Sequence, residues 1–151
     1  DPIDSFNEDT ILIDYKCTYG DKSCILKFKM KADNWTIDKE DKVLTLNDLK
    51  TTGKPIGFFM QNSFKHYGYA RQLGAYQECL RLYCRKEHGV TIKDWTFKTN
   101  IIAVETIGEN RAGVFKIYPN QLKKGREEFY DLMKRVGICE MFGYDDTIEF
   151  V

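Results

Sequence analysis

Two aspartates and a lysine, Asp33, Asp48 and Lys50, are the residues of this sequence best placed to do chemistry. They lie on two runs that alternate like β-strands, residues 24–33 and 43–50, which a polar segment joins into a hairpin. A hairpin centred on that segment places Asp33 directly opposite Asp48, with their Cβ atoms about 5 Å apart. Lys50 then shares a face with Asp48, because side chains alternate along a strand.

The two opposed carboxylates predict a bound cation. Like charges directly opposite each other destabilise a sheet, so their repulsion must be offset. A hard divalent cation does this, and Mg²⁺ is typically held by one or two carboxylates together with water and phosphate oxygens. Lys50 would stand beside the metal, where it could orient a water molecule or neutralise charge that develops on a phosphate. The alternative is an exposed hairpin whose charges are solvated.

A third acidic residue is predicted at the same end of the sheet. Residues 10–18 alternate like a strand, and a tight glycine turn folds them back onto the next strand. Extending this register places Glu8 opposite Asp33. The competing candidate, Asp14, pairs with Lys27 and lies roughly 20 Å along the strand from Asp33. Glu8 is therefore favoured, and a solvated acid near the N-terminus is the alternative reading of it.

The remaining elements have to position these side chains. A helix is predicted from Asn62 or Ser63 to His88, because apolar residues recur at three- and four-residue spacing and Gly89 follows. Gln72 and Tyr76 lie one turn apart on that helix and share a face. Its glycines suggest close packing against the sheet. Two further strands, 95–107 and 113–118, and a helix 119–136 that Gly137 ends complete the order β-β-β-α-β-β-α.

Composition bounds the classes of function. The 151 residues fit one domain, and 23 basic side chains balance 23 acidic ones. Zero net charge argues against coating nucleic acid by bulk charge, but it leaves room for a local basic groove. Such a face is predicted on the second strand, where it suits a polyanion such as DNA, although ordinary solvent-facing lysines are the alternative; it comprises Ile25, Lys27, Lys29, Lys31 and Asp33.

No apolar run approaches the length of a membrane span, and no signal-peptide pattern opens the chain. The odd count of five cysteines favours reduced, packed thiols in the cytoplasm over a zinc site or a disulfide framework. A bridge between Cys17 and Cys24, which face each other across the first hairpin, is the alternative.

The ordered set of motifs resembles the PD-(D/E)XK nuclease superfamily, and within it the RecB-like exonucleases of the RecE and lambda-type group used in phage recombination. The likeness spans roughly residues 8–136. Glu8 with the strand after it resembles the upstream glutamate and strand of these exonucleases. The other matching pieces are Ala32-Asp33, Asp48-Leu49-Lys50-Thr51-Thr52 and the helix motif Gln72-x-x-x-Tyr76.

The resemblance implies an α/β (α+β) fold with a mixed central β-sheet flanked by helices, as in restriction endonucleases. It implies a Mg²⁺ or Mn²⁺ site whose ligands are Glu8, Asp33, Asp48 and the Leu49 carbonyl. Lys50 would position the attacking water, and Gln72 and Tyr76 would line the site or contact the DNA backbone.

The activity that the resemblance implies is metal-dependent DNA cleavage, most simply by an exonuclease that acts on duplex ends or single strands. Its setting would be recombination or repair in the cytoplasm of a bacterial or phage-infected cell, with room for a recombination partner protein and for a homo-oligomer.

Two departures qualify this picture. Ala32 stands where the family often has proline, and the helices that normally precede Glu8 and help to form the DNA channel are missing from the sequence. Residues 1–151 are therefore interpreted as a single nuclease-like domain without those helices. The alternative function is a module of the same fold that binds DNA or a protein without cleavage.

Overall fold

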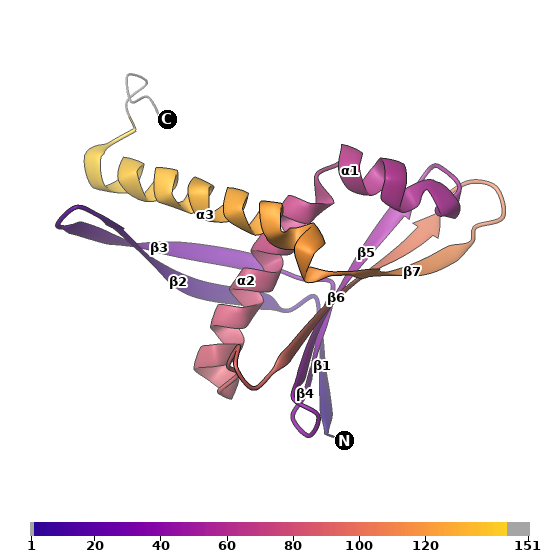
Figure 1. Ribbon diagram of the computed structural model, residues 1–151, viewed down its shortest axis with the longest axis horizontal. Helices are drawn as coiled ribbons and strands as arrows, with labels where there is room; N and C mark the ends of the chain where they lie inside the picture. Colours follow the sequence, from indigo (N-terminus) through magenta and orange to yellow (C-terminus); the bar gives the residue numbers. More distant parts are fainter. Residues whose placement is uncertain (1, 145–151) are drawn as a thin grey trace.

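The computed structural model describes residues 2–144 (Figure 1). Along the chain its elements are β1 (Ile3–Asn7), β2 (Thr10–Tyr19), β3 (Lys22–Lys31), β4 (Asn34–Asp38), β5 (Val43–Thr52), the short turns η1 (Ile56–Phe58, 3₁₀) and η2 (Phe59–Ser63, π), α1 (Phe64–His66), α2 (Tyr69–His88), β6 (Thr96–Glu105), β7 (Ala112–Ile117) and α3 (Pro119–Phe142).

A mixed five-stranded sheet forms the centre, in the order β1-β4-β5-β6-β7. Only the pair β5 and β6 within it is parallel, and the other neighbouring strands are antiparallel. A parallel pair needs a crossover connection, and α2 provides it here. The predicted mixed sheet flanked by helices is therefore confirmed, but the predicted order of elements missed two strands, β1 and β4.

The hairpin that was predicted to carry Asp33 and Asp48 has the expected register but a different first strand. Asn34 pairs with Asn47 and Asp38 with Val43, as the predicted centre of the turn requires. The strand predicted over residues 24–33 is present as β3, but it ends at Lys31, and the strand that pairs with β5 is β4, which begins at Asn34. The chain changes direction between them, where the Ala32 side chain enters the core and is fully buried.

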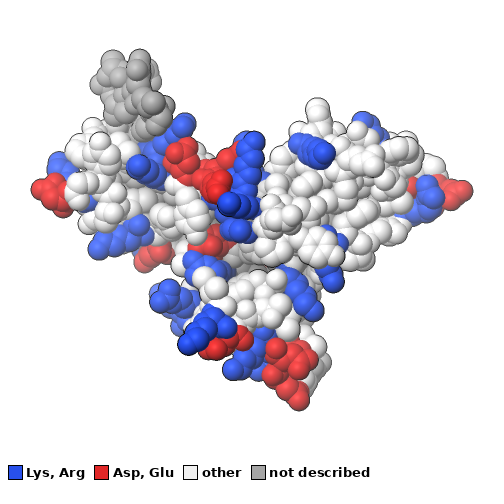
Figure 2. Space-filling model, in the orientation of Figure 1, with Lys and Arg blue, Asp and Glu red and all other residues white. Residues whose placement is uncertain are grey.

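The strands β2 and β3 form a separate two-stranded ribbon, which Figure 1 shows running alongside α3. Its register is the predicted one, with Cys17 opposite Cys24 and Asp14 opposite Lys27. The predicted basic face therefore lies on this ribbon and is not on the sheet that carries Asp48, which corrects its expected place. Over the face drawn in Figure 2, acidic and basic side chains are interspersed and neither sign dominates.

All five cysteines are free. The thiols of Cys17 and Cys24 point to α3, where they donate to the Met133 and Gly137 carbonyls at 3.4 and 3.6 Å. Within residues 2–144, no helix combines the length and the apolar character needed to cross a membrane.

Two glycines set a close crossing of α2 and α3. A Cβ on Gly74 would lie 2.7 Å from the Arg126 nitrogen, and one on Gly125 would lie 2.1 Å from the Ala70 carbonyl oxygen. Gly74 was expected to bring the helix close to the sheet, and the structure shows that it brings α2 against α3. This crossing fixes the first turns of α2, from which Gln72 projects.

Two other glycines differ from their predicted roles. Gly68 adopts a left-handed backbone with a φ of 64°, so the single predicted helix is broken there into α1 and α2. Gly137 does not end the last helix, which continues to Phe142. A Cβ at Gly137 would lie 2.6 Å from the Cys17 Cβ, so this glycine provides the close contact between α3 and the ribbon.

Replacing Gly125 by alanine is expected to lower the free energy of unfolding by about 3 kcal/mol, because the added methyl group forces α2 and α3 apart. Gly57→Ala is the matched control, since nothing lies within 4 Å of its Cβ position. The control is expected to be neutral or slightly stabilising. Chemical denaturation of both variants measures the difference, and equal midpoints would contradict the close crossing.

Candidate active site

The site is built on one face of β5. Leu44, Leu46, Asp48 and Thr52 occupy alternate positions on that strand and are all buried, with Asp48 only 3% exposed. The alternation places Asp48 and Lys50 on the face that looks toward α2. A carboxylate in this row of apolar residues is costly unless a partner offsets its burial.

Asp33 reaches β5 from the link between β3 and β4. Its Oδ2 accepts the Leu49 amide N–H at 2.7 Å, which holds its exposed carboxylate beside the strand. Its backbone carbonyl accepts the Glu8 amide N–H at 3.0 Å. Asp33 is thus next to the residue that follows Asp48, and its backbone is next to that of Glu8, as predicted. Asp33 itself lies just outside β4.

The electrostatics of Asp48 are unusual for a carboxyl group. Burial raises its pKa above the ordinary value, the Lys50 ammonium acts in the opposite direction, and the charge of Asp33 raises the pKa further. Within the described residues, Asp48 Oδ2 has no hydrogen bond of ordinary geometry, although Lys50 Nζ lies 3.0 Å away. The ion pair therefore compensates the buried carboxylate only in part.

Lys50 is held by three groups. Besides Asp48, its ammonium donates to Gln72 Oε1 at 2.7 Å and lies 4.6 Å from the centre of the Tyr69 ring. The lysine side chain is 16% exposed, so these contacts lie in a poorly hydrated setting where charge interactions are strong. The structure thus brings together Asp33, Asp48, Lys50 and Gln72.

Tyr69 was missed by the sequence analysis. A cation over an aromatic face is stabilised by the ring quadrupole, so this tyrosine helps to fix the Lys50 ammonium. Its signal was present in the sequence, because Tyr69 precedes Gln72 by three residues and shares its helix face. Tyr76, one turn further along, is half-buried and packs against the hydrophobic core.

The remaining predicted ligands are not gathered at one point. Glu8 is exposed, with a φ of 52°, and its contact with Asp33 is through the backbone. Asp14 pairs with Lys27 at 2.7 Å on the ribbon, as its register predicted. Among residues 2–144, no three His, Cys, Asp and Glu side chains converge in the manner of a metal site. Binding of a metal ion by the Glu8 carboxylate and the Leu49 carbonyl therefore stays a prediction.

The residues present nevertheless fit a hard divalent cation. Asp48 offers a buried oxygen without a regular hydrogen bond, and the neighbouring Asp33 carboxylate is open to solvent on one side. Mg²⁺ commonly takes one or two carboxylates and completes its shell with water and phosphate oxygens. A site with one carboxylate on the lysine-bearing strand β5 and a second carboxylate beside that strand meets this requirement.

We compared the sequence and the fold with those of known proteins. No family model matches the sequence. No curated protein is significantly similar to it. A solved crystal structure from Eubacterium rectale, of a protein that carries the name "Putative exonuclease", superposes with a TM-score of 0.55 at 14% sequence identity.

That likeness covers 93% of this chain and 47% of the other, so the chain spans about half the length of that protein. At this identity the superposition shows a shared fold.

Proposed function

We propose that this chain is a metal-dependent deoxyribonuclease of the PD-(D/E)XK type, which hydrolyses phosphodiester bonds as an exonuclease in recombination or repair. The observation that carries the proposal is the buried Asp48, flanked by Asp33 and paired with Lys50 at 3.0 Å. The shared fold with a protein named as an exonuclease supports it. DNA is the proposed substrate.

The proposed division of labour follows from the contacts. A bound Mg²⁺ or Mn²⁺ would polarise the phosphate and lower the pKa of a water molecule. Asp33 and Asp48 would hold the ion. The Lys50 ammonium, fixed by Gln72 and Tyr69, would stabilise negative charge that grows on the phosphate during attack. Gln72 is then a positioning residue, because it acts through the lysine.

A second candidate is a module of this fold that binds DNA without cutting it. It is favoured by the absence, among the described residues, of a third carboxylate gathered with Asp33 and Asp48. The partly buried Lys50 speaks against it, because a lysine that only binds phosphate has no need to be drawn away from solvent and fixed by three contacts.

One incubation separates these functions. The protein is mixed with linear and with covalently closed circular duplex DNA, in Mg²⁺ or in chelator. An exonuclease is expected to degrade the linear molecule and spare the circle in Mg²⁺, and to leave both molecules intact in chelator. Cutting of the circle would replace the exonuclease by an endonuclease, and retention of both DNAs as intact complexes would favour the binding module.

A further inference from the structure

An open hollow of about 420 Å³ lies beyond the C-terminal end of β5. Its wall comes from the loop after β5 and from η2 and α1, and it includes Lys54, Lys65 and His66. Of the described residues that line it, none is acidic. Two lysines and a histidine around an open hollow favour an anionic ligand.

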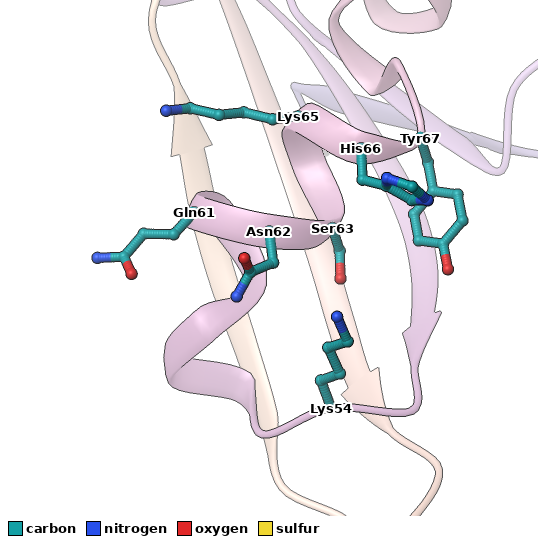
Figure 3. A pocket seen from close by; sticks show the side chains of 7 residues that line it. All are labelled: Lys54, Gln61, Asn62, Ser63, Lys65, His66 and Tyr67. Atoms are coloured by element: carbon teal, nitrogen blue, oxygen red, sulfur yellow. The ribbon is translucent and has the colours of Figure 1, made fainter.

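Figure 3 shows how the side chains lie. Four side chains project from the helical segment toward the loop after β5: those of Asn62, Ser63, His66 and Tyr67. The Lys54 amine points toward them from that loop. The side chains of Gln61 and Lys65 point away. Lys54 is the cation that faces the inside of the hollow.

The hollow is tied to the candidate active site through β5. Thr52 Oγ1 accepts the Lys54 amide N–H at 3.3 Å and lies 3.5 Å from the Ser63 hydroxyl. Thr52 follows Lys50 on the same face, so the two lie roughly 7 Å apart along the strand. A strand of nucleic acid that places a phosphate at Lys50 would therefore reach the hollow with its neighbouring nucleotide.

An aromatic stack makes the second link. The Tyr67 ring, 65% exposed, stacks on Tyr69 at 5.7 Å and an angle of 29°. Tyr69 in turn contacts the Lys50 ammonium and stacks on the buried Phe59 ring at 6.0 Å. The left-handed Gly68 between the two tyrosines provides the turn that leaves Tyr67 outside. An exposed ring supported from beneath is a platform on which a flat group can stack.

We propose that this hollow binds one unpaired nucleotide next to the phosphate at Lys50, with its base stacked on Tyr67 and its phosphate held by Lys54 and His66. Base–aromatic stacking needs a free face on the base, which a base inside a duplex does not offer. The inference rests on the proposed function for the identity of the strand, and it adds that the site takes a frayed or single-stranded end.

The test measures binding in chelator, so that cleavage plays no part. A short fluorescent single-stranded DNA is titrated with the wild-type protein and with Tyr67→Ala, Tyr67→Phe and Tyr144→Ala. Tyr144 is the matched control, because it is 68% exposed and follows the far end of α3. Tyr67→Ala is expected to weaken binding roughly 5- to 100-fold, while Tyr67→Phe and Tyr144→Ala keep wild-type affinity.

A strand with an abasic position separates stacking from charge. If a base stacks on Tyr67, then wild type and Tyr67→Ala are expected to bind a strand without bases with equal affinity. Lys54→Gln is expected to reduce the salt dependence of binding by about 0.7 to 1 unit on either strand. Equal binding of the intact strand by wild type and Tyr67→Ala, or an equal loss on the abasic strand, would overturn the nucleotide pocket.

The two proposals can fail separately. Mg²⁺-dependent cleavage with binding that does not depend on Tyr67 would overturn the pocket and keep the nuclease. Tyr67-dependent binding of single strands without cleavage in any divalent ion would support the pocket and overturn the nuclease.

Discussion

Asp48→Asn is expected to abolish divalent-dependent cleavage while the fold is kept. The substitution removes an anionic oxygen from the proposed metal site but keeps the size of the side chain. Loss of a metal ligand removes several kcal/mol of transition-state stabilisation, which corresponds to about 10³-fold or more in rate. Initial rates on linear duplex DNA at matched Mg²⁺ concentrations measure the effect.

Stability gives an independent readout for the same variant. Because burial raises the pKa of Asp48, the folded protein holds this proton more tightly than the unfolded chain does. The ionised carboxylate therefore opposes folding at neutral pH, and wild-type stability gains as the pH falls through the raised pKa. Asp48→Asn is expected to be at least as stable as wild type near pH 7 without metal, with its advantage shrinking on acidification.

The control is Asp14→Asn, which removes an exposed carboxylate paired with Lys27 on the ribbon, away from β5. It is expected to cleave DNA at the wild-type rate. Full cleavage by Asp48→Asn, or equal losses in the two variants, would show that the buried aspartate is not a metal ligand. A stability loss in Asp48→Asn at neutral pH would show instead that the carboxylate supports the fold.

The part of the site that could be predicted is the part fixed by alternation and register. The position of the turns was enough to pair Asp14 with Lys27 and Asn34 with Asn47, and period two put Asp48 and Lys50 on one face. The strand limits were harder to predict, because residues 24–38 alternate almost without interruption. The structure places the break after Lys31, where Ala32 is buried in the core and the chain passes from the ribbon to the central sheet.

The roles of the glycines were harder to predict, because a glycine that ends a helix and a glycine that allows two elements to pack closely look the same in a sequence. Gly89 ends a helix as predicted, with a left-handed backbone that suits glycine, whereas Gly137 lies inside α3 against Cys17. The crossing of Gly74 with Gly125 joins helices that are far apart in sequence, so no local pattern could predict it. Such contacts decide which side of α2 faces Lys50.

Lys50→Ala is expected to lower turnover by about 10² to 10³-fold while DNA binding falls only modestly. A group that stabilises charge only in the transition state affects the rate far more than the affinity. Mutagenesis of single preorganised donors gives losses of this size. Single-turnover rates and equilibrium binding in Ca²⁺ or chelator measure the two quantities separately.

Part of the loss of turnover in Lys50→Ala is expected to arise from a change at Asp48, and this part can be separated from the direct effect of the missing ammonium. Without the Lys50 ammonium, the pKa of Asp48 rises further, because the nearby positive charge that lowers it is gone. The carboxylate then holds its proton more tightly and competes less well for metal. Higher Mg²⁺ and higher pH are expected to restore this part of the rate, and what stays lost belongs to Lys50 itself.

The matched control is Lys93→Ala, which removes an exposed lysine from the turn before β6. A lysine that only contacts phosphate contributes about one unit to the salt dependence of binding and leaves turnover largely intact. Lys93→Ala is expected to stay close to wild type in both measurements. Gln72→Ala should reproduce part of the Lys50→Ala defect, because the 2.7 Å contact that holds the ammonium is then missing. If Lys50→Ala and Lys93→Ala changed turnover and binding alike, then the Lys50 ammonium would have no catalytic role, and its contacts would serve only to offset the burial of Asp48.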